Sequence, residues 1–149
     1  MNINHRTRAL ACATLLAMAG VQAEACTSIV LNANDGGRIY GRTMEFGIDL
    51  KSEAAQMPRG FQNTSAGPDG TPGKGKSWTS KYAVIGANAF GQPLFVDGIN
   101  EAGLAGGLLN AVNTAKYQDV PVGQEGNSIP PQTLLTYVLT NFATVDEVK

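Results

Sequence analysis

The segment ACTSIVLNANDGGRIYGRTMEF, residues 25–46, decides the expected fold. Residues 27–32 are rich in β-branched side chains, which favour a strand. The Asn-Asp-Gly-Gly run at 34–37 is typical of a tight hairpin, because glycine tolerates a positive φ. Residues 38–46 have the pattern of the returning strand. The segment therefore predicts a hairpin that brings the chain back past Cys26.

The residues before this cysteine have the layout of a secretory signal. A basic start is followed by an apolar run at 9–20, which is too short to span a bilayer. Two small-residue cleavage patterns end at Ala23 and Ala25. We therefore expect a signal peptide over residues 1–25, removed in one step or two, and an exported mature domain over 26–149. Such a protein would be periplasmic or secreted.

Charge and residue counts exclude several classes of function. The net charge is −1, and loss of the signal, with two arginines and one glutamate, leaves about −2. This balance gives no reason to expect nucleic acid as a partner, or a membrane after processing. Because Cys12 and His5 both lie in the signal, the mature chain keeps one cysteine and no histidine. It has no means of forming an internal disulfide or a Cys-His pair, and no metal site or cofactor is expected.

The middle of the chain is expected to hold a long loop and then more strands. Residues 57–80 are rich in Gly, Pro, Ser, Thr and Lys, which indicates an exposed lid or rim. The Gly-Lys-Gly-Lys-Ser run at 73–77 lacks the spacing of a phosphate-binding loop. Strands are expected at 82–87 and 93–98. Dense glycines at 105–110 indicate backbone packed against backbone or against a bound group.

A helix is predicted from Pro130 or Pro131, and a second helix start from the capping box at 144–147. The apolar face of the first helix consists of residues at helical spacing: Leu134, Leu135, Val138, Leu139 and Phe142. The sequence ends at Lys149, one turn into the second helix. We therefore expect these residues alone to form an incomplete domain with little activity.

Cys26 has three interpretations on chemical grounds. It is a buried structural thiol, a lipid-modified cysteine that anchors an exported binding domain without catalysis, or a nucleophile. As the first residue it carries an α-amine with a reference pKa of about 7.7 to 8.0, which can act as the base. Arg42 is the candidate cation that favours the thiolate, and Glu45 the candidate partner of the α-ammonium group. In a regular strand these two residues face opposite ways, so both reach Cys26 only if a bulge, a bend or the strand end intervenes.

Two motifs carry a resemblance to a known family. The first is Cys26-Thr27 with an apolar strand, a glycine-rich turn and Tyr-Gly-Arg-Thr-Met-Glu at 40–45. The second is Phe-Val-Asp-Gly-Ile-Asn-Glu-Ala-Gly-Leu at 95–104, followed by Gly-Leu-Leu-Asn at 107–110. In this order the motifs resemble the choloylglycine hydrolase family, which contains bile salt hydrolases and penicillin V acylases.

The resemblance implies an α+β fold, the N-terminal part of the four-layer αββα sandwich of N-terminal nucleophile hydrolases. It implies hydrolysis of a linear, non-peptide amide by Cys26, with Arg42 beside the thiolate and Asn110 in the oxyanion hole. Glu45 stands where the family often has aspartate. The expected partner is a small-molecule amide: a bile salt, a phenoxyacetyl penicillin or an acyl-homoserine lactone. The secretory signal slightly favours the acylase branch.

The resemblance leaves three matters open. A later asparagine and a second arginine of the family have no counterpart in these residues. A homo-oligomer stays open for the full-length enzyme. A peptidase or ceramidase-like amidase with the same terminal nucleophile is an alternative, as is the lipid-anchored binding domain.

Overall fold

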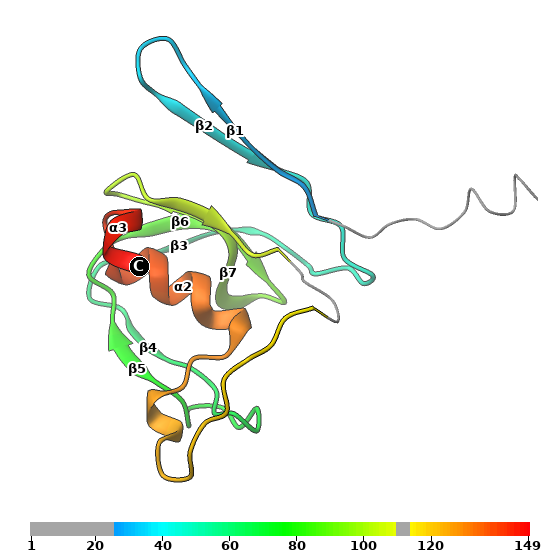
Figure 1. Cartoon of the computed structure of the whole chain (residues 1–149), viewed down its shortest axis with the longest axis vertical. Helices are drawn as coiled ribbons and strands as arrows, with labels where there is room; N and C mark the ends of the chain where they lie inside the picture. The colour runs from blue at the N-terminus through cyan, green and yellow to red at the C-terminus, as the bar shows by residue number, and fades with distance from the viewer. Residues whose placement is uncertain (1–25, 110–113) are drawn as a thin grey trace, which may run out of the picture.

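The computed structural model describes residues 26–109 and 114–149 (Figure 1). The predicted signal at 1–25 and the predicted site residue Asn110 lie outside the described residues. The described part is mixed α+β, with more strands than helices, as the sequence predicts. Within it, no helix has the length and apolar character needed to cross a membrane.

The main sheet has four antiparallel strands in the order β3-β6-β7-β8. Their bounds are β3 Ala54–Met57, β6 Val84–Ala89, β7 Gln92–Asn100 and β8 Ala105–Gly107. Strands β6 and β7 form the hairpin that the sequence predicts. Its two turn residues, Phe90 and Gly91, have φ of 55° and 62°, the left-handed pair that matches the twist of the strands.

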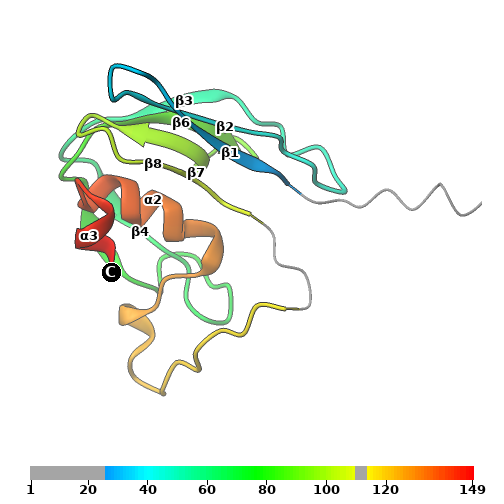
Figure 2. The same cartoon turned by 45° about the horizontal axis from the view of Figure 1, so that its top comes forward.

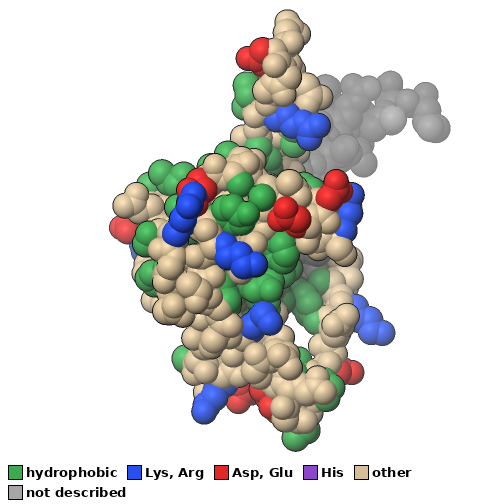
Figure 3. Space-filling view, turned by 90° about the vertical axis from the view of Figure 1, so that its left-hand side faces the viewer, with side chains coloured by type: hydrophobic (Ala, Val, Ile, Leu, Met, Phe, Trp, Pro, Cys, Tyr) green, Lys and Arg blue, Asp and Glu red, His purple; other side chains and the backbone are tan. Residues whose placement is uncertain are grey.

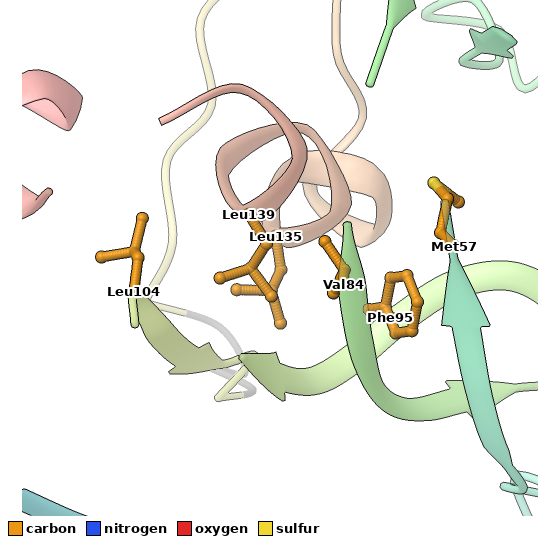
Figure 4. Close-up of a cluster of buried hydrophobic side chains, with 6 residues drawn as sticks. All are labelled: Met57, Val84, Phe95, Leu104, Leu135 and Leu139. Atoms are coloured by element: carbon orange, nitrogen blue, oxygen red, sulfur yellow. The ribbon is translucent and has the colours of Figure 1, made fainter. Parts of the chain in front are cut away.

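Helix α2, Pro131–Asn141, covers one face of this sheet and completes the core (Figures 2 and 4). It begins where the sequence predicts, with proline in the first turn. The buried apolar cluster joins the sheet to the helix through Met57, Val84, Phe95, Leu104, Leu135 and Leu139. Of the predicted apolar face, Leu134 is 48% exposed, while Thr136 and Thr140 are buried instead. Thr136 Oγ1 accepts the backbone N–H of Phe95 at 2.9 Å, which explains a polar residue at this position.

The prediction of an exposed loop over 57–80 is wrong for part of that segment. It contains a second antiparallel pair, β4 Gln62–Thr64 with β5 Ser77–Thr79. Trp78 of β5 is buried, and its Nε1 donates to Thr140 Oγ1 of α2 at 2.9 Å. The segment is therefore packed against the helix, by tertiary contacts that its Gly- and Pro-rich composition does not reveal.

The N-terminal hairpin consists of β1 Ser28–Asn32 and β2 Arg38–Arg42, and its tip stands away from the body (Figures 1 and 3). Gly36 in its turn has φ +86°, as the Asn-Asp-Gly-Gly run predicts. Its apolar side chains are exposed, Ile29 and Ile39 by 55% and 61%. The returning strand ends at Arg42, four residues before the predicted end at 46.

The C-terminal part adds a 3₁₀ turn at Glu125–Asn127 and helix α3, Val145–Val148. One of the two bonds of the predicted capping box is present: Thr144 Oγ1 accepts the N–H of Glu147 at 3.3 Å. The Glu147 carboxylate in turn accepts the N–H of Ala143 at 2.8 Å.

Glu101 connects the turn between β7 and β8 to the residue before β6 through hydrogen bonds. Its carboxylate forms a bidentate pair with Arg59 and accepts the N–H of Ala83 at 2.7 Å. The bonds from Arg59 first, and then that from Ala83, lower the pKa of Glu101 from 4.5 to about 2. Since the folded pKa lies below the unfolded one, this stabilisation is complete at neutral pH and is lost as the pH falls toward about 2.

We therefore expect Glu101→Gln to flatten the acid limb of the stability profile. In urea titrations between about pH 6 and pH 2, the variant should be less stable than the unmodified protein near pH 6, and the difference should shrink with falling pH. Glu53→Gln is the matched control. Glu53 is exposed directly before the edge strand β3, and in the described structure its carboxylate forms no hydrogen bond or ion pair. A difference that persists undiminished at pH 2 would contradict the assignment.

Candidate active site

Cys26 lies two residues before the start of β1, at the base of the N-terminal hairpin. The ladder of the hairpin continues one step past β1, because the N–H of Thr43 donates to the carbonyl of Thr27 at 2.9 Å. Cys26 is half-buried, and its thiol donates to the backbone carbonyl of Glu45 at 3.3 Å. The thiol is thus held against the segment that follows β2, and remains partly accessible to solvent.

Thr43 connects Glu45 to the residue that follows the cysteine. Its hydroxyl donates to the Glu45 carboxylate at 3.0 Å and accepts the N–H of Thr27 at 3.1 Å. This contact is possible because β2 ends at Arg42, so the next residues leave the strict alternation of a strand. The strand end, one of the three solutions that the sequence allowed for Arg42 and Glu45, therefore brings Glu45 to Cys26.

Arg42 docks the hairpin onto the main sheet. Its side chain is 6% exposed, and its Nη1 donates to the carbonyl of Leu108 at 2.7 Å and to that of Val96 at 3.1 Å. Its Nε donates to the carbonyl of Thr43 at 3.1 Å. In the register of the hairpin Arg42 is paired with Ser28, two residues from Cys26, so the guanidinium and the thiol start from the same face of the ribbon. A buried, always charged group is therefore fixed beside the start of β1, at Ser28.

A β-bulge in β7 supplies one of the carbonyls that Arg42 uses. Ala87 of β6 pairs with Asp97, but the next residue, Asn88, pairs with Phe95, which leaves Val96 as the extra residue. Without the bulge, residues 95 and 97 would share a face. With it, Phe95 enters the core beneath α2 while Asp97 lies on the opposite face, toward the hairpin.

Tyr40 and Asp97 complete the surroundings of the guanidinium. Tyr40 lies two residues before Arg42 and therefore on the same face of β2. Burial raises the pKa of Tyr40, and so do the charge of Asp97 and, to a smaller extent, the thiol of Cys26, while Arg42 opposes this shift. Burial also raises the pKa of Asp97, against the positive charge of Arg42 and the nearby Tyr40 hydroxyl. Tyr40 and Asp97 are each partly buried beside the guanidinium.

Of the four predicted site residues, Cys26 and Glu45 are in contact through the thiol and the Glu45 carbonyl, Arg42 is bonded to the carbonyl of Thr43 in the same segment, and Asn110 lies outside the described residues. Sequence reasoning missed Thr43, Tyr40 and Asp97. Two signals were available: Tyr40 has the same strand parity as Arg42, and Asp97 is a lone acid within an otherwise apolar strand. In the described residues no group of three or more His, Cys, Asp or Glu side chains is arranged to hold a metal ion.

A cavity of about 1240 Å³ lies elsewhere in the described structure. It is bordered by the segments 64–70, 116–121 and 127–134 together with the start of β7. Neither Cys26 nor the guanidinium of Arg42 lines it. The site described above is therefore defined by its contacts and not by this cavity.

Comparison with known proteins identifies the class. Residues 26–149 match the family of linear amide C–N hydrolases, choloylglycine hydrolase family. The chain is 32% identical over 126 residues to the bile salt hydrolase/transferase of Clostridium perfringens, covering 83% of this chain and 36% of that protein. It is 30% identical over an alignment of 154 positions to the penicillin V acylase of Pectobacterium atrosepticum, covering 97% of this chain and 39% of that protein.

A solved structure agrees with these matches. The crystal structure of a mutant conjugated bile acid hydrolase from Clostridium perfringens superimposes with a TM-score of 0.64 at 31% identity, covering 83% of this chain and 36% of that one. The chain belongs to the linear amide C–N hydrolases of the choloylglycine hydrolase family. It spans somewhat more than a third of the length of these relatives.

Proposed function

We propose that the whole protein hydrolyses linear, non-peptide amides, with the Cys26 thiol as nucleophile and the α-amine of the same residue as base. The placement of Cys26 carries this proposal. The family match begins at this residue, and its thiol lies against Glu45 at the base of the hairpin. Removal of residues 1–25 during export would free the amine, which gives a periplasmic or secreted enzyme.

The neighbouring residues receive roles from their positions. The buried guanidinium of Arg42 favours the thiolate, because a cation nearby stabilises the charged form of a thiol. The Glu45 carboxylate, oriented by Thr43, holds the α-ammonium group. Asn110 contributes an oxyanion donor, a role that rests on the resemblance of the Gly-Leu-Leu-Asn run.

The reaction is acyl transfer to water through a thioester. The α-amine takes the thiol proton, and the sulfur attacks the amide carbon to form a C–S bond while the carbonyl electron pair moves to oxygen. The C–N bond then breaks, and the leaving nitrogen takes the proton from the ammonium group. Water adds to the thioester, the C–S bond breaks, and the carboxylic acid and the free thiol result.

The substrate class follows from the relatives and from the signal. The relatives are named for bile salts, conjugated bile acids and penicillin V. We infer that the substrate is a small molecule in which an acyl group is joined to an amine by a secondary amide. Export favours the acylase side of this range.

Trapping the acyl-enzyme tests the proposal. The whole protein, expressed with its signal, is incubated with phenoxymethylpenicillin or a glycine-conjugated bile salt and quenched in acid. Mass spectrometry should show a mature chain that begins with unmodified Cys26 and, after substrate, an adduct of the acyl mass on that thiol. The Cys26→Ala protein, which has no thiol to acylate, is the control and should show no adduct.

Two outcomes would overturn the proposal. A diacylglyceryl group on Cys26 would exclude the enzyme and favour the lipid-anchored binding domain. Turnover that proceeds undiminished in Cys26→Ser, without an adduct in the unmodified protein, would place the nucleophile elsewhere.

A further inference from the structure

Asp97 pairs with Arg42 through charge, without a hydrogen bond between the two side chains. Its Oδ2 lies 3.8 Å from Arg42 Nε, is shielded from solvent, and has no hydrogen-bond partner in the described structure. The Asp97 side chain as a whole is 25% exposed. A buried carboxylate oxygen without a donor is costly, so its retention next to a buried guanidinium requires an explanation.

Gly107 has no side chain, and Arg42 and Asp97 lie next to the space that a side chain there would fill. It is paired with Asp97 across β7 and β8. A Cβ at this position would overlap the Tyr40 hydroxyl and would lie 2.9 Å from Arg42 Nη1 and 3.1 Å from Asp97 Oδ2. The backbone of Gly107 is not in the left-handed region, so what this position needs is room and not an unusual φ. Three polar groups, two from β2 and one from β7, therefore lie around the position that a methyl group of residue 107 would occupy.

From this convergence we propose that Asp97 is a positioning residue, which holds the Arg42 guanidinium in place for Cys26 in the space left by Gly107. Arg42 donates its described hydrogen bonds to the carbonyls of Thr43, Val96 and Leu108, and these bonds fix the position of its side chain along the sheet. The carboxylate of Asp97 adds a charge that keeps the guanidinium at the hairpin side of the sheet. The inference rests on the proposed role of Cys26 as a nucleophile.

The direction in which Asp97→Asn changes the formation of the Cys26 thiolate distinguishes a positioning role of Asp97 from an effect of its charge alone. If Asp97 acted only through its negative charge, Asp97→Asn would remove a repulsion and make the Cys26 thiolate easier to form. If Asp97 positions Arg42, the variant loosens the cation, and the thiolate becomes harder to form. If Asp97 is merely structural, the variant lowers the unfolding temperature and leaves thiolate formation unchanged. The other charged or titratable groups around the thiol in the described structure are Tyr40 and Glu45.

The experiment measures the pH dependence of Cys26 alkylation by iodoacetamide in the whole protein, with unfolding temperature and kcat alongside. For Asp97→Asn we expect the midpoint of the alkylation profile to rise by about one pH unit. Below the midpoint, the thiolate population and kcat should then fall about tenfold. A midpoint that falls or stays unchanged would overturn the proposal.

Gly107→Ala provides a second variant in case Asp97→Asn does not fold. Its methyl group displaces the Tyr40 hydroxyl and Arg42, so the midpoint should rise here too. Gly106→Ala is the matched control on the same strand, because its methyl group would meet Leu135 Cδ1 of α2 at 3.2 Å. It should lower the unfolding temperature without moving the midpoint. Equal midpoints in both glycine variants would contradict the proposal.

Alkylation also keeps this inference separate from the proposed function. A protein that hydrolyses no amide but shows the predicted midpoint shift retains the positioning role and loses the proposed reaction. A protein that traps an acyl group on Cys26, yet shows unchanged midpoints in both Asp97→Asn and Gly107→Ala, retains the reaction and loses the positioning role.

Discussion

Replacement of Cys26 with alanine is expected to abolish amide hydrolysis by the whole protein. No other residue in the described structure combines a thiol with the base that the proposed reaction uses. Removing the nucleophile from hydrolases of this general kind lowers kcat by on the order of 10⁴-fold or more. We therefore expect turnover of phenoxymethylpenicillin or a conjugated bile salt to fall by at least this factor, measured by release of the amine.

The stability of the Cys26→Ala protein should change little. Cys26 is only half-buried, and its thiol makes one hydrogen bond, to the carbonyl of Glu45. Substitutions at such positions usually change the free energy of unfolding by about 0.5 kcal/mol or less. Asn32→Ala, at the exposed far end of β1, is the control and should retain full activity. Loss of activity together with loss of folding in Cys26→Ala would contradict a purely catalytic role.

The elements that the sequence predicted are those encoded by local chemistry. The turn at Gly36 depends on the backbone freedom of glycine, and the start of α2 at Pro131 depends on the fixed φ of proline. Each was therefore visible without knowledge of distant contacts. The same holds for the capping box at Thr144, whose partners lie within four residues.

The features that the sequence did not reveal depend on distant partners. The strand end at Arg42 is coupled to hydrogen bonds with Val96 and Leu108, 54 and 66 residues away. The bulge at Val96 shows only as a shift in pairing between β6 and β7. Trp78 lies in a segment whose composition suggests a loop, and it is buried because Thr140 of α2 accepts its N–H. The sequence pattern of a single strand contains no information on contacts with such distant residues.

The candidate site likewise contains residues that the sequence identified and a residue that it did not. Cys26, Arg42 and Glu45 were identified because a chain without histidine needs another base, another cation and a partner for the amine. That reasoning starts from the reaction and not from the packing. Asp97 escaped it because its placement opposite Gly107 requires the pairing of β7 with β8.

Arg42→Ala is expected to lower both stability and thiol reactivity. The variant leaves the carbonyls of Val96 and Leu108 without their donor, and it leaves the Asp97 carboxylate facing no charge. Removing one partner of a buried pair costs about 3 to 5 kcal/mol, and we expect the lower end because Asp97 is partly exposed. Urea titration of the whole protein should show this loss, and iodoacetamide should alkylate Cys26 more slowly at neutral pH.

Arg38→Ala separates this effect from a general weakening of the hairpin. Arg38 lies on the same strand, but it is exposed and pairs only with Asn32 in the register of β1 and β2. Its loss should change the free energy of unfolding by about 0.5 kcal/mol or less. In both stability and alkylation rate, Arg42→Lys should lie between Arg42→Ala and Arg38→Ala. Lysine keeps the charge but lacks the planar guanidinium that donates to several carbonyls at once. If Arg42→Lys matched the unmodified protein in both measurements, the charge alone would account for the role of Arg42, and the hydrogen bonds to Val96 and Leu108 would be dispensable.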